Sequence, residues 1–421
     1  MSSLSKKDRL KVLVAAFLGW MFAGVIMSIM IPATRPAIQE FLSADTSTNA
    51  IQLLEQSAES WFSWYLVAFF LGAALGGAVL GSVGDRYGRV KAMGISILCY
   101  SCFTGLSYFA SSPEQLLVLR FIACMGIGGM WPSGVALVAE SWPDVSRPIL
   151  AGLIGTAANV GFLILGILML SNPITSESWR WVLLLGTTPL ILGIWVLLSV
   201  PESPRWKSEK ENPKTGEKKS SLGEVFRPPL LRLTLVGIFL GTIPLLGGWA
   251  SGQRLVPWAG RIAEANDLPQ LQAMTQTIWA IGAVIGSLAG GWIASRMGRR
   301  ASYFAVSLLS LGLSLYVFIY SNPTAGTFLP AVFGVGLIST IFFGWLPYFL
   351  PELFPTRVRA TGAGVSFNFG RILSAVAVLS TAFLINVFQG DIAKMGAATS
   401  LVYALGMVIV IFIPKESHLE E

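Results

Sequence analysis

The sequence is poor in charge and almost devoid of histidine. Only 12% of its 421 residues are Asp, Glu, Lys or Arg, and its one histidine, His418, lies in the C-terminal tail. A soluble domain carries about a quarter charged residues. Apolar residues make up 54% of this chain. The composition therefore excludes an ordinary soluble protein and favours an integral membrane protein.

The side chains that usually carry enzymatic or metal chemistry are also scarce. The three cysteines, Cys99, Cys102 and Cys124, lie in apolar stretches without further ligands nearby, which is typical of packing residues. We find no phosphate-binding glycine loop, no cluster of metal ligands and no nucleophile–base set. The sequence therefore predicts a protein that is not an enzyme and that has no metal or cofactor.

The apolar residues are gathered in runs of about 20, the length that a helix needs to cross about 30 Å of hydrocarbon. Because lipid offers no partner for backbone N–H and C=O groups, such spans must be helices. The pattern predicts an all-α membrane protein with twelve transmembrane helices. Their approximate ranges are 10–33, 60–80, 92–111, 115–138, 148–171, 179–200, 231–257, 269–294, 301–320, 326–350, 359–388 and 394–413.

Basic residues predict the orientation, since they remain on the cytoplasmic side. Most of the 29 Lys and Arg lie in the two tails and in the loops that follow the even-numbered spans. We expect a multi-pass protein of the plasma (inner) membrane with both termini cytoplasmic. The net charge of +7 then reflects topology and needs no nucleic-acid partner. The first apolar run is too long for a cleaved signal peptide.

The longest polar interruption, residues 201–229, is rich in Lys, Glu, Ser and Pro. It predicts a cytoplasmic linker between two six-helix bundles, formed by residues 1–200 and 230–421. We expect the chain to work as a monomer in the lipid bilayer.

The two predicted halves repeat each other. The stretch "GSVGDRYGRV" (81–90) corresponds to "GWIASRMGRR" (291–300), 210 positions later. The stretch "AESWPDVSR" (139–147) corresponds to "PELFPTRVR" (351–359), 212 positions later. Both matches run in one direction on the same predicted face, so the repeats are parallel and related by an axis along the membrane normal.

These motifs carry a resemblance to a known family. "GSVGDRYGRV" resembles the loop between helices 2 and 3 of the major facilitator superfamily, and Arg120 followed by "GIGG" is similar to its fourth helix. "PESPR" (201–205) resembles the sugar-porter signature, and "AESWPDVSR" the sialate and carboxylate symporters. The resemblance implies the major facilitator fold and transport by alternating access of two bundles.

The repeated charges predict a gate on the cytoplasmic side. Exposed ion pairs are worth only about 0–1 kcal/mol each, so a few of them hold a closed face reversibly. We expect Arg86 and Arg89 to reach Glu140, Arg296 and Arg299 to reach Glu352, and Asp85 to face the start of the eleventh span. The second half has Ser295 where the first has Asp85. The predicted gating set is Asp85, Arg86, Arg89, Glu140, Arg147, Arg296, Arg299, Glu352 and Arg359. The alternative is that these charges only fix topology.

In a transporter of parallel repeats, the substrate site is expected near the bilayer midplane. Counting from the span ends places Trp20, Asn159, Trp279, Asn368 and Arg371 midway, and Gln276 and Arg120 nearer the outside. Those seven form the predicted substrate site. Arg371 is the strongest candidate, because a cation at that depth needs a function or a partner and its guanidinium can hold a carboxylate through two hydrogen bonds.

Each of these residues also has a structural alternative. Arg371 can bond to helix-end carbonyls or to Asn159, and the resemblance implies a scaffold role for Arg120. Trp20 and Trp279 either line the cavity or pack within the bundle. Arg35 and Arg254, at the outer ends of their spans, either attract an anion or lie among lipid headgroups.

The spans contain no Asp, Glu or His away from their ends, and such groups usually relay protons. We therefore expect a uniporter or an exchanger, unless Glu59, at the edge of the second span, is drawn inward. The predicted function is transport of a small polar metabolite, a sugar or sugar acid. The alternatives are an organic-anion exchanger or carboxylate symporter, and, from another class, a channel.

Overall fold

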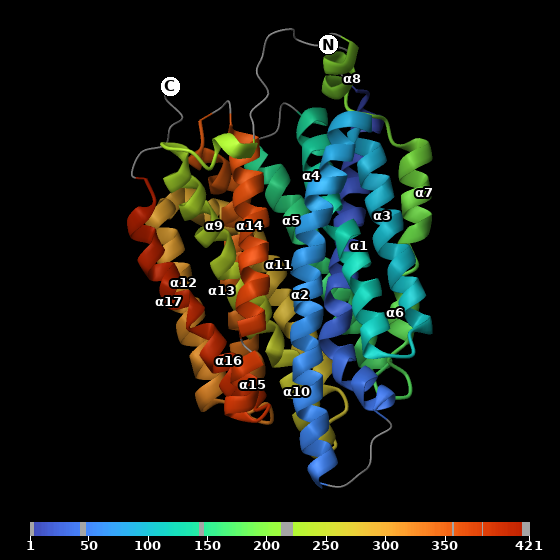
Figure 1. The fold of residues 1–421 in the computed structure, drawn as a ribbon, viewed down its shortest axis with the longest axis vertical. Coiled ribbons are helices and arrows are strands. Elements are labelled where there is room, and N and C mark those ends of the chain that lie inside the picture. Colours follow the sequence, from blue (N-terminus) through green and yellow to red (C-terminus); the bar gives the residue numbers. More distant parts are fainter. Residues whose placement is uncertain are drawn as a thin grey trace.

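The computed structural model describes residues 4–42, 48–142, 147–211, 222–355, 358–380 and 382–414. Over these residues the chain forms helices and no strand. Twelve helical segments are long and apolar enough to cross a membrane, which confirms the predicted all-α membrane class. Figure 1 shows them running side by side along the long axis of the molecule.

The first six spans contain seven α-helices and a short 3₁₀ turn, and the last of these spans is made from two helices. They are α1 (Lys6–Phe41), α2 (Thr48–Tyr87), α3 (Arg89–Leu106) with η1 (Ser107–Phe109), α4 (Pro113–Ser141), α5 (Arg147–Ser171), α6 (Trp181–Leu185) and α7 (Pro189–Ser199). The polar segment that follows forms α8 (Pro204–Glu211) and the short turn η2 (Leu222–Glu224).

The last six spans are more often interrupted. They contain α9 (Leu230–Leu246), η3 (Gly247–Ser251), η4 (Gly252–Arg254), α10 (Leu255–Ala265), α11 (Leu271–Met297), α12 (Arg299–Leu315), η5 (Tyr316–Tyr320), α13 (Phe328–Phe349), η6 (Leu350–Leu353), α14 (Arg359–Ser380), α15 (Ala382–Phe388), α16 (Ile392–Ser400), α17 (Val402–Ile409) and η7 (Val410–Phe412). The seventh span changes from α-helix to a π turn after Pro244, because proline removes a backbone hydrogen bond.

The second span differs from its prediction. Helix α2 begins at Thr48, twelve residues before the predicted start at 60. Two carboxylates, Glu55 and Glu59, consequently lie in the first part of this helix, and both are buried. Glu59, the residue named above as the exception if drawn inward, is thus buried among the helices. The pairing of these carboxylates with arginines, described below, explains how apolar surroundings tolerate them.

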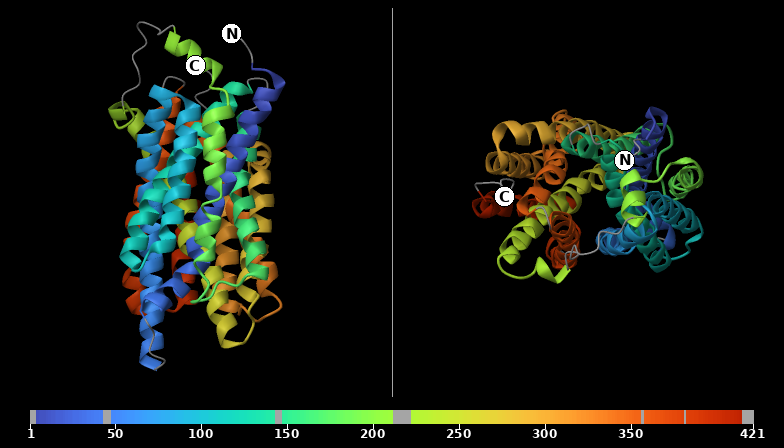
Figure 2. Two further views of the ribbon diagram at one scale, coloured as in Figure 1. Left: turned by 90° about the vertical axis from the view of Figure 1, so that its right-hand side faces the viewer. Right: turned by 90° about the horizontal axis from the view of Figure 1, so that it is seen from above.

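The first six spans lie on one side of the molecule and the last six on the other (Figure 1). Helix α1 begins and η7 ends at the same end of the bundle, where α8 also lies, as the side view in Figure 2 shows. We call this the terminal end and the opposite one the far end. The exact division at 1–200, 201–229 and 230–421 stays a prediction.

Matched glycines allow the same close helix contact in each half. A Cβ at Gly76 of α2 would lie 1.9 Å from the Met125 carbonyl oxygen of α4, and a Cβ at Gly286 of α11 would lie 1.9 Å from the Leu337 oxygen of α13. Both distances are far below van der Waals contact. The two positions are 210 residues apart, so the sequence repeat corresponds to repeated packing.

The repeat also ends two helices in the same way. Gly88 has φ +117° between α2 and α3, and Gly298 has φ +77° between α11 and α12. Residues with side chains rarely adopt such angles. The glycines of the two charged loops therefore permit the sharp passage from one span to the next.

Candidate functional site

The predicted substrate site contains two buried arginines, one from each half. Arg120 lies in α4 and is 6% exposed, and Arg371 lies in α14 and is 7% exposed. Both are close enough to the Cys124 side chain to interact with it electrostatically. The two cations therefore face the same region between the halves.

Arg371 connects the halves through neutral groups. Its Nη1 donates to the Ala73 carbonyl of α2 at 3.2 Å and to Asn368 Oδ1 at 3.2 Å, and its guanidinium lies 4.8 Å from the centre of the Phe367 ring. The expected structural partners were helix-end carbonyls or Asn159. Instead, Arg371 contacts a carbonyl in the middle of α2.

Arg120 is held by two backbone carbonyls of α1. Its Nη1 donates to the Ile26 oxygen at 2.6 Å and its Nη2 to the Met27 oxygen at 3.1 Å, while its buried Nε has no partner. These bonds fit the scaffold role that the resemblance implies. Arg120 also lines a small cavity together with Met27, Tyr65 and Trp249.

Neither arginine forms an ion pair with any residue that the structure describes. A buried charge normally requires a partner of opposite sign or a wet cavity. The centre of the protein therefore carries two positive charges that its own carboxylates do not balance.

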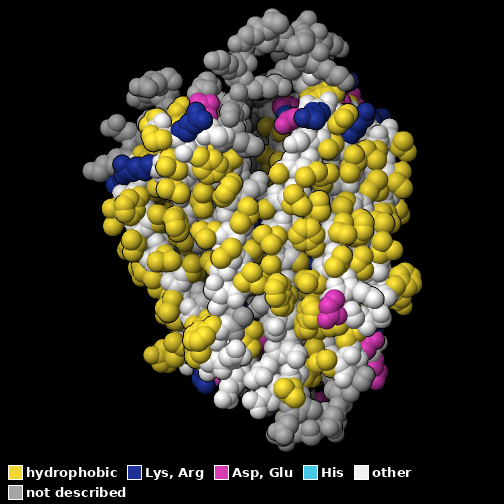
Figure 3. Space-filling model, in the orientation of Figure 1, with side chains coloured by type: hydrophobic (Ala, Val, Ile, Leu, Met, Phe, Trp, Pro, Cys, Tyr) yellow, Lys and Arg dark blue, Asp and Glu magenta, His cyan; other side chains and the backbone are white. Residues whose placement is uncertain are grey.

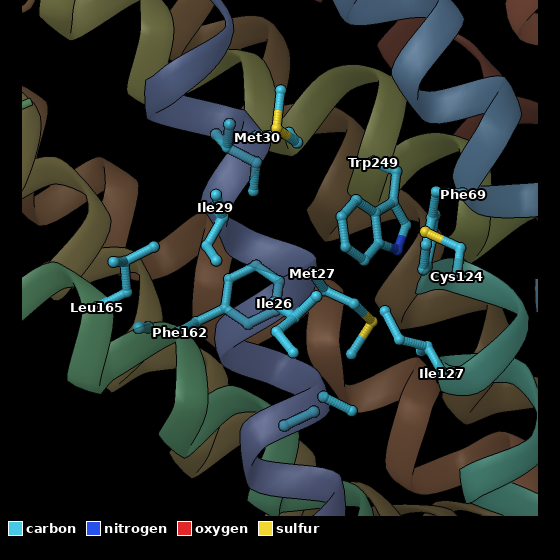
Figure 4. Packing of buried hydrophobic residues seen from close by; sticks show 14 of the residues in the cluster. Ile26, Met27, Ile29, Met30, Phe69, Cys124, Ile127, Phe162, Leu165 and Trp249 are labelled. Atoms are coloured by element: carbon cyan, nitrogen blue, oxygen red, sulfur yellow. The ribbon is translucent and has the colours of Figure 1, made fainter. Parts of the chain in front are cut away.

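Aromatic rings surround this centre. Trp249, which the sequence reasoning did not single out, lies 4.5 Å from Phe69 and 5.9 Å from Phe162 between ring centroids. Figure 4 shows Trp249 beside Phe69 and Cys124, with Met27 and Phe162 close to it. Trp279 packs on Phe162 at 5.5 Å, and Trp20 on Trp131 at 4.9 Å.

Polar side chains join α5 to α11 across the halves. Asn159 Nδ2 donates to Ser287 Oγ at 3.0 Å and to the Ala283 carbonyl at 3.3 Å. Gln276 Nε2 donates to the Phe162 carbonyl at 3.3 Å. The buried polar atoms of the second half that have no hydrogen-bond partner include Gln253 Oε1, Gln276 Oε1 and Trp279 Nε1. The site therefore retains hydrogen-bonding capacity on that side.

The charged loops of the terminal end form ion pairs within each half. Arg89 pairs with Asp85 and lies 3.8 Å from Glu140, and Arg299 pairs with Glu352. Two expected contacts are absent. Within the described residues, the exposed Arg86 forms no ion pair, and Arg296 lies over the Trp292 ring at 5.3 Å instead of reaching Glu352.

The expectation that Asp85 faces the start of the eleventh span stays a prediction. Asp85 pairs with Arg89 in its own half, four residues away at the start of α3. Arg359 Nε donates to the Phe354 carbonyl at 3.4 Å, and the side chain of Arg147 lies outside the described residues. The gating roles of these groups stay predictions.

A further carboxylate, Glu202 of the "PESPR" segment, holds the first charged loop. It accepts the backbone N–H of Arg89 at 3.0 Å and of Val90 at 3.1 Å. Trp206 Nε1 donates to the Asp85 carbonyl at 2.9 Å. A negative charge at a helix N-terminus is favourable, so the start of the linker caps α3.

Burial raises the pKa of Glu352 above its ordinary value, although Arg299 and Arg359 act in the opposite direction. The desolvation cost of this carboxylate thus exceeds the gain from its arginine neighbours.

At the far end, by contrast, three ion pairs join one half to the other. Arg35 of α1 donates to Glu264 of α10 at 2.6 Å, and Arg254 of η4 donates to Glu59 of α2 at 3.2 Å. Arg261 lies 3.8 Å from Glu55. At the terminal end the surface is instead hollowed between the two sets of helices (Figure 3). Among the described residues, the ion pairs that join the halves therefore lie at the far end, and a hollow lies between the halves at the terminal end (Figure 3).

The comparisons with known proteins agree with this architecture. The family model of the Major Facilitator Superfamily matches residues 12–378. The chain belongs to the major facilitator superfamily. This membership confirms the resemblance found in the charged loops and establishes a membrane transporter of small molecules, not an enzyme.

Several relatives of this superfamily member are named for their substrates, including the following two. The chain is 26% identical to the sialic acid transporter NanX of Escherichia coli K12, over 86% of this chain and 83% of that protein. It is 28% identical to the cis,cis-muconate transport protein of Acinetobacter baylyi, over 82% and 84%. A D-xylose–proton symporter shares the fold, with a TM-score of 0.72 at 14% identity over 96% of this chain and 97% of that one.

Proposed function

We propose that this protein carries a small carboxylate-bearing metabolite, a sugar acid or a related organic acid, by alternating access across the plasma (inner) membrane. The terminal end faces the cytoplasm, as the distribution of Lys and Arg indicates. The described conformation is then the inward-open one.

The observation that carries this proposal is the pair of buried arginines, Arg120 and Arg371, without protein counter-charges. An anion between the halves balances this charge, and a guanidinium suits a carboxylate through paired hydrogen bonds. A neutral sugar would leave the charge unbalanced. The surrounding aromatic rings and the free atoms of Gln276 and Trp279 provide contacts for the remainder of the molecule.

The relatives support the same chemistry. Sialic acid and muconate, named for two of them, both carry carboxylate groups, although one is a sugar and the other an unsaturated diacid. The shared feature is the acid, and the arginines are the groups that recognise it.

Reconstituted protein tests this function. We expect wild-type proteoliposomes to take up at least one radiolabelled acid from a panel of sialic acid, glucuronate and cis,cis-muconate, and not xylose. Arg371→Gln is expected to reduce kcat/KM for that acid at least about tenfold, the effect of about 1.4 kcal/mol, and Arg371→Lys is expected to retain part of it. The matched control is Arg232→Gln, which removes an exposed arginine from the same half and is expected to leave uptake within about twofold.

Full acid uptake by Arg371→Gln, or uptake of xylose and of none of the acids, would contradict the proposal. The same proteoliposomes also test whether transport of the acid is coupled to protons. Because Glu59 is engaged by Arg254, we propose uniport or anion exchange, in which a lumenal pH dye reports no proton uptake with the acid.

A further inference from the structure

Six charges at the far end form ion pairs between the halves and balance one another, unlike the charges of the centre. Three arginines meet three glutamates in the pairs Arg35–Glu264, Arg261–Glu55 and Arg254–Glu59, each of which joins one half to the other, and Arg35 also bonds Glu55. Arg254 is the most deeply placed of them. Its side chain is 0% exposed, and that of Glu59 is 5% exposed.

Arg254 is nonetheless incompletely satisfied. Its Nε donates to Glu59 and its Nη1 to the Ala250 carbonyl, but its buried Nη2 has no partner. Its guanidinium lies over the Phe62 ring at 5.7 Å. The Arg254 guanidinium can bind a carboxylate through two of its nitrogens, but it contacts only one carboxylate oxygen of Glu59.

Two small cavities lead from this cluster toward the centre. The first is lined by Arg35, Glu55, Glu59 and Phe62, and the second by Phe62, Tyr65, Trp249 and Arg120. Phe62 and Ile31 line both, so the two cavities adjoin at these side chains. The far-end charges and Arg120 therefore lie along one route.

From this arrangement we infer that Arg254 is a loading site for the substrate carboxylate when the far end is open, and that Glu59 displaces the carboxylate as that end closes. The inference rests on the proposed function, since it requires an anionic substrate.

The geometry gives the reason. Glu59 moves with the first half and Arg254 with the second, so opening the far end separates them. Arg254 then presents an unpaired guanidinium at the start of the route. When the halves close, Glu59 returns to Arg254 and competes with the bound acid. The acid is then free to pass Phe62 and reach Arg120 and Arg371, which have no competing carboxylate.

A loading site at the far end predicts that its loss changes the KM measured from that side of the membrane and not the KM measured from the other side. The test uses proteoliposomes of known orientation and the panel acid that the wild-type protein transports fastest. We compare two KM values, one for acid that enters the protein from the far-end side and one for acid that enters it from the terminal-end side. Arg254→Gln is expected to raise the far-side KM at least tenfold and to change the terminal-side KM less than twofold. Glu59→Gln removes the competitor and is expected to lower the far-side KM.

Two further variants keep the test decisive. Arg254→Gln leaves Glu59 buried without its partner, so the neutral double variant Arg254→Gln/Glu59→Gln guards against misfolding; it is expected to keep the raised far-side KM. Lys394→Gln removes an exposed positive charge paired only with Asp391 and controls for general attraction of anions. Equal changes of both KM values in the double variant, or an unchanged far-side KM, would overturn the inference. If the proposed function itself is wrong, the wild-type protein will transport none of the acids, which is a different result from those above.

Discussion

At the scale of single residues, the distribution of charge partners distinguishes a closed gate from a binding site. Arg35, Arg254 and Arg261 at the far end each face a glutamate of the other half, so they stabilise contact between the halves. Arg120 and Arg371 face carbonyls, an amide and an aromatic ring. Neutral dipoles hold a guanidinium in place without cancelling its charge, which leaves it able to attract an anion.

The raised pKa of Glu352 predicts how the stability of the protein changes with pH. Its raised pKa means that the described state favours the neutral carboxyl, so the stability it contributes is complete below the ordinary pKa of about 4.3 and declines as pH rises through the higher native value. The substitution Glu352→Gln makes this side chain neutral at every pH. We expect its melting temperature at pH 7.5 to equal or exceed that of the wild type, with the advantage vanishing at pH 4.

The partner variant should behave oppositely. Arg299→Gln leaves a half-buried carboxylate without its ion pair, so its melting temperature at pH 7.5 should fall, by about 2 °C or more. Thermal unfolding followed by tryptophan fluorescence measures both variants. A Glu352→Gln protein that is markedly less stable at pH 7.5 would show that the ion pair outweighs desolvation.

The sequence predicted the positions of individual residues well where only their depth along a membrane span mattered. Counting along the apolar runs placed Arg371 and Asn368 at the same level, and the structure bonds them to each other. It could not predict that Arg371 donates to Ala73, because this depends on which helix of the other half packs beside α14. The ion pair of Glu59 could not be predicted, because apolar runs place Glu59 at the edge of the second span and do not show that Arg254 meets it across the halves.

At the scale of helices, the repeat was predictable and the interruptions were not. Equal spacing of glycines and charges in the two halves produced equal packing of α2 on α4 and α11 on α13. By contrast, the seventh span reads as one apolar run yet contains π and 3₁₀ turns at Gly247–Ser251 and Gly252–Arg254. These turns set the positions of Trp249 and Arg254, so their roles appeared only in three dimensions.

The matched glycines predict a packing defect on substitution. Gly76→Ala and Gly286→Ala each place a Cβ 1.9 Å from a backbone oxygen of the adjacent helix, so the helices must separate. We expect each variant to lose stability, by about 1–3 kcal/mol, measured as a lower melting temperature in detergent.

The control is Gly312→Ala in α12, where an added Cβ meets nothing within 4 Å. Alanine is favoured over glycine in a helix by about 1 kcal/mol, so this variant should match or exceed the wild type. Equal destabilisation by all three substitutions would indicate that close helix contact is not the reason for the glycines.

At the scale of the whole molecule, the two ends differ. Three ion pairs join the halves at the far end, whereas the terminal-end ion pairs between described residues stay within each half, and a hollow lies between the helices there (Figure 3). Twelve spans and the parallel repeat were predictable from the sequence. The open side was not, because the same ion-pairing residues are present in every conformation and only their partners change.

Opposite movement of the two ends tests the central claim, that an acid between the halves is exposed to each side in turn. Spin labels at Tyr87 and Met297 report on the terminal end, and labels at Ile51 and Leu268 on the far end; all four residues are exposed. The native cysteines are replaced by serine, and double electron–electron resonance gives both distances with and without the transported acid. We expect the acid to shorten the terminal-end distance and lengthen the far-end distance. Changes of the same sign at both ends, or no change in protein that transports the acid, would contradict the account.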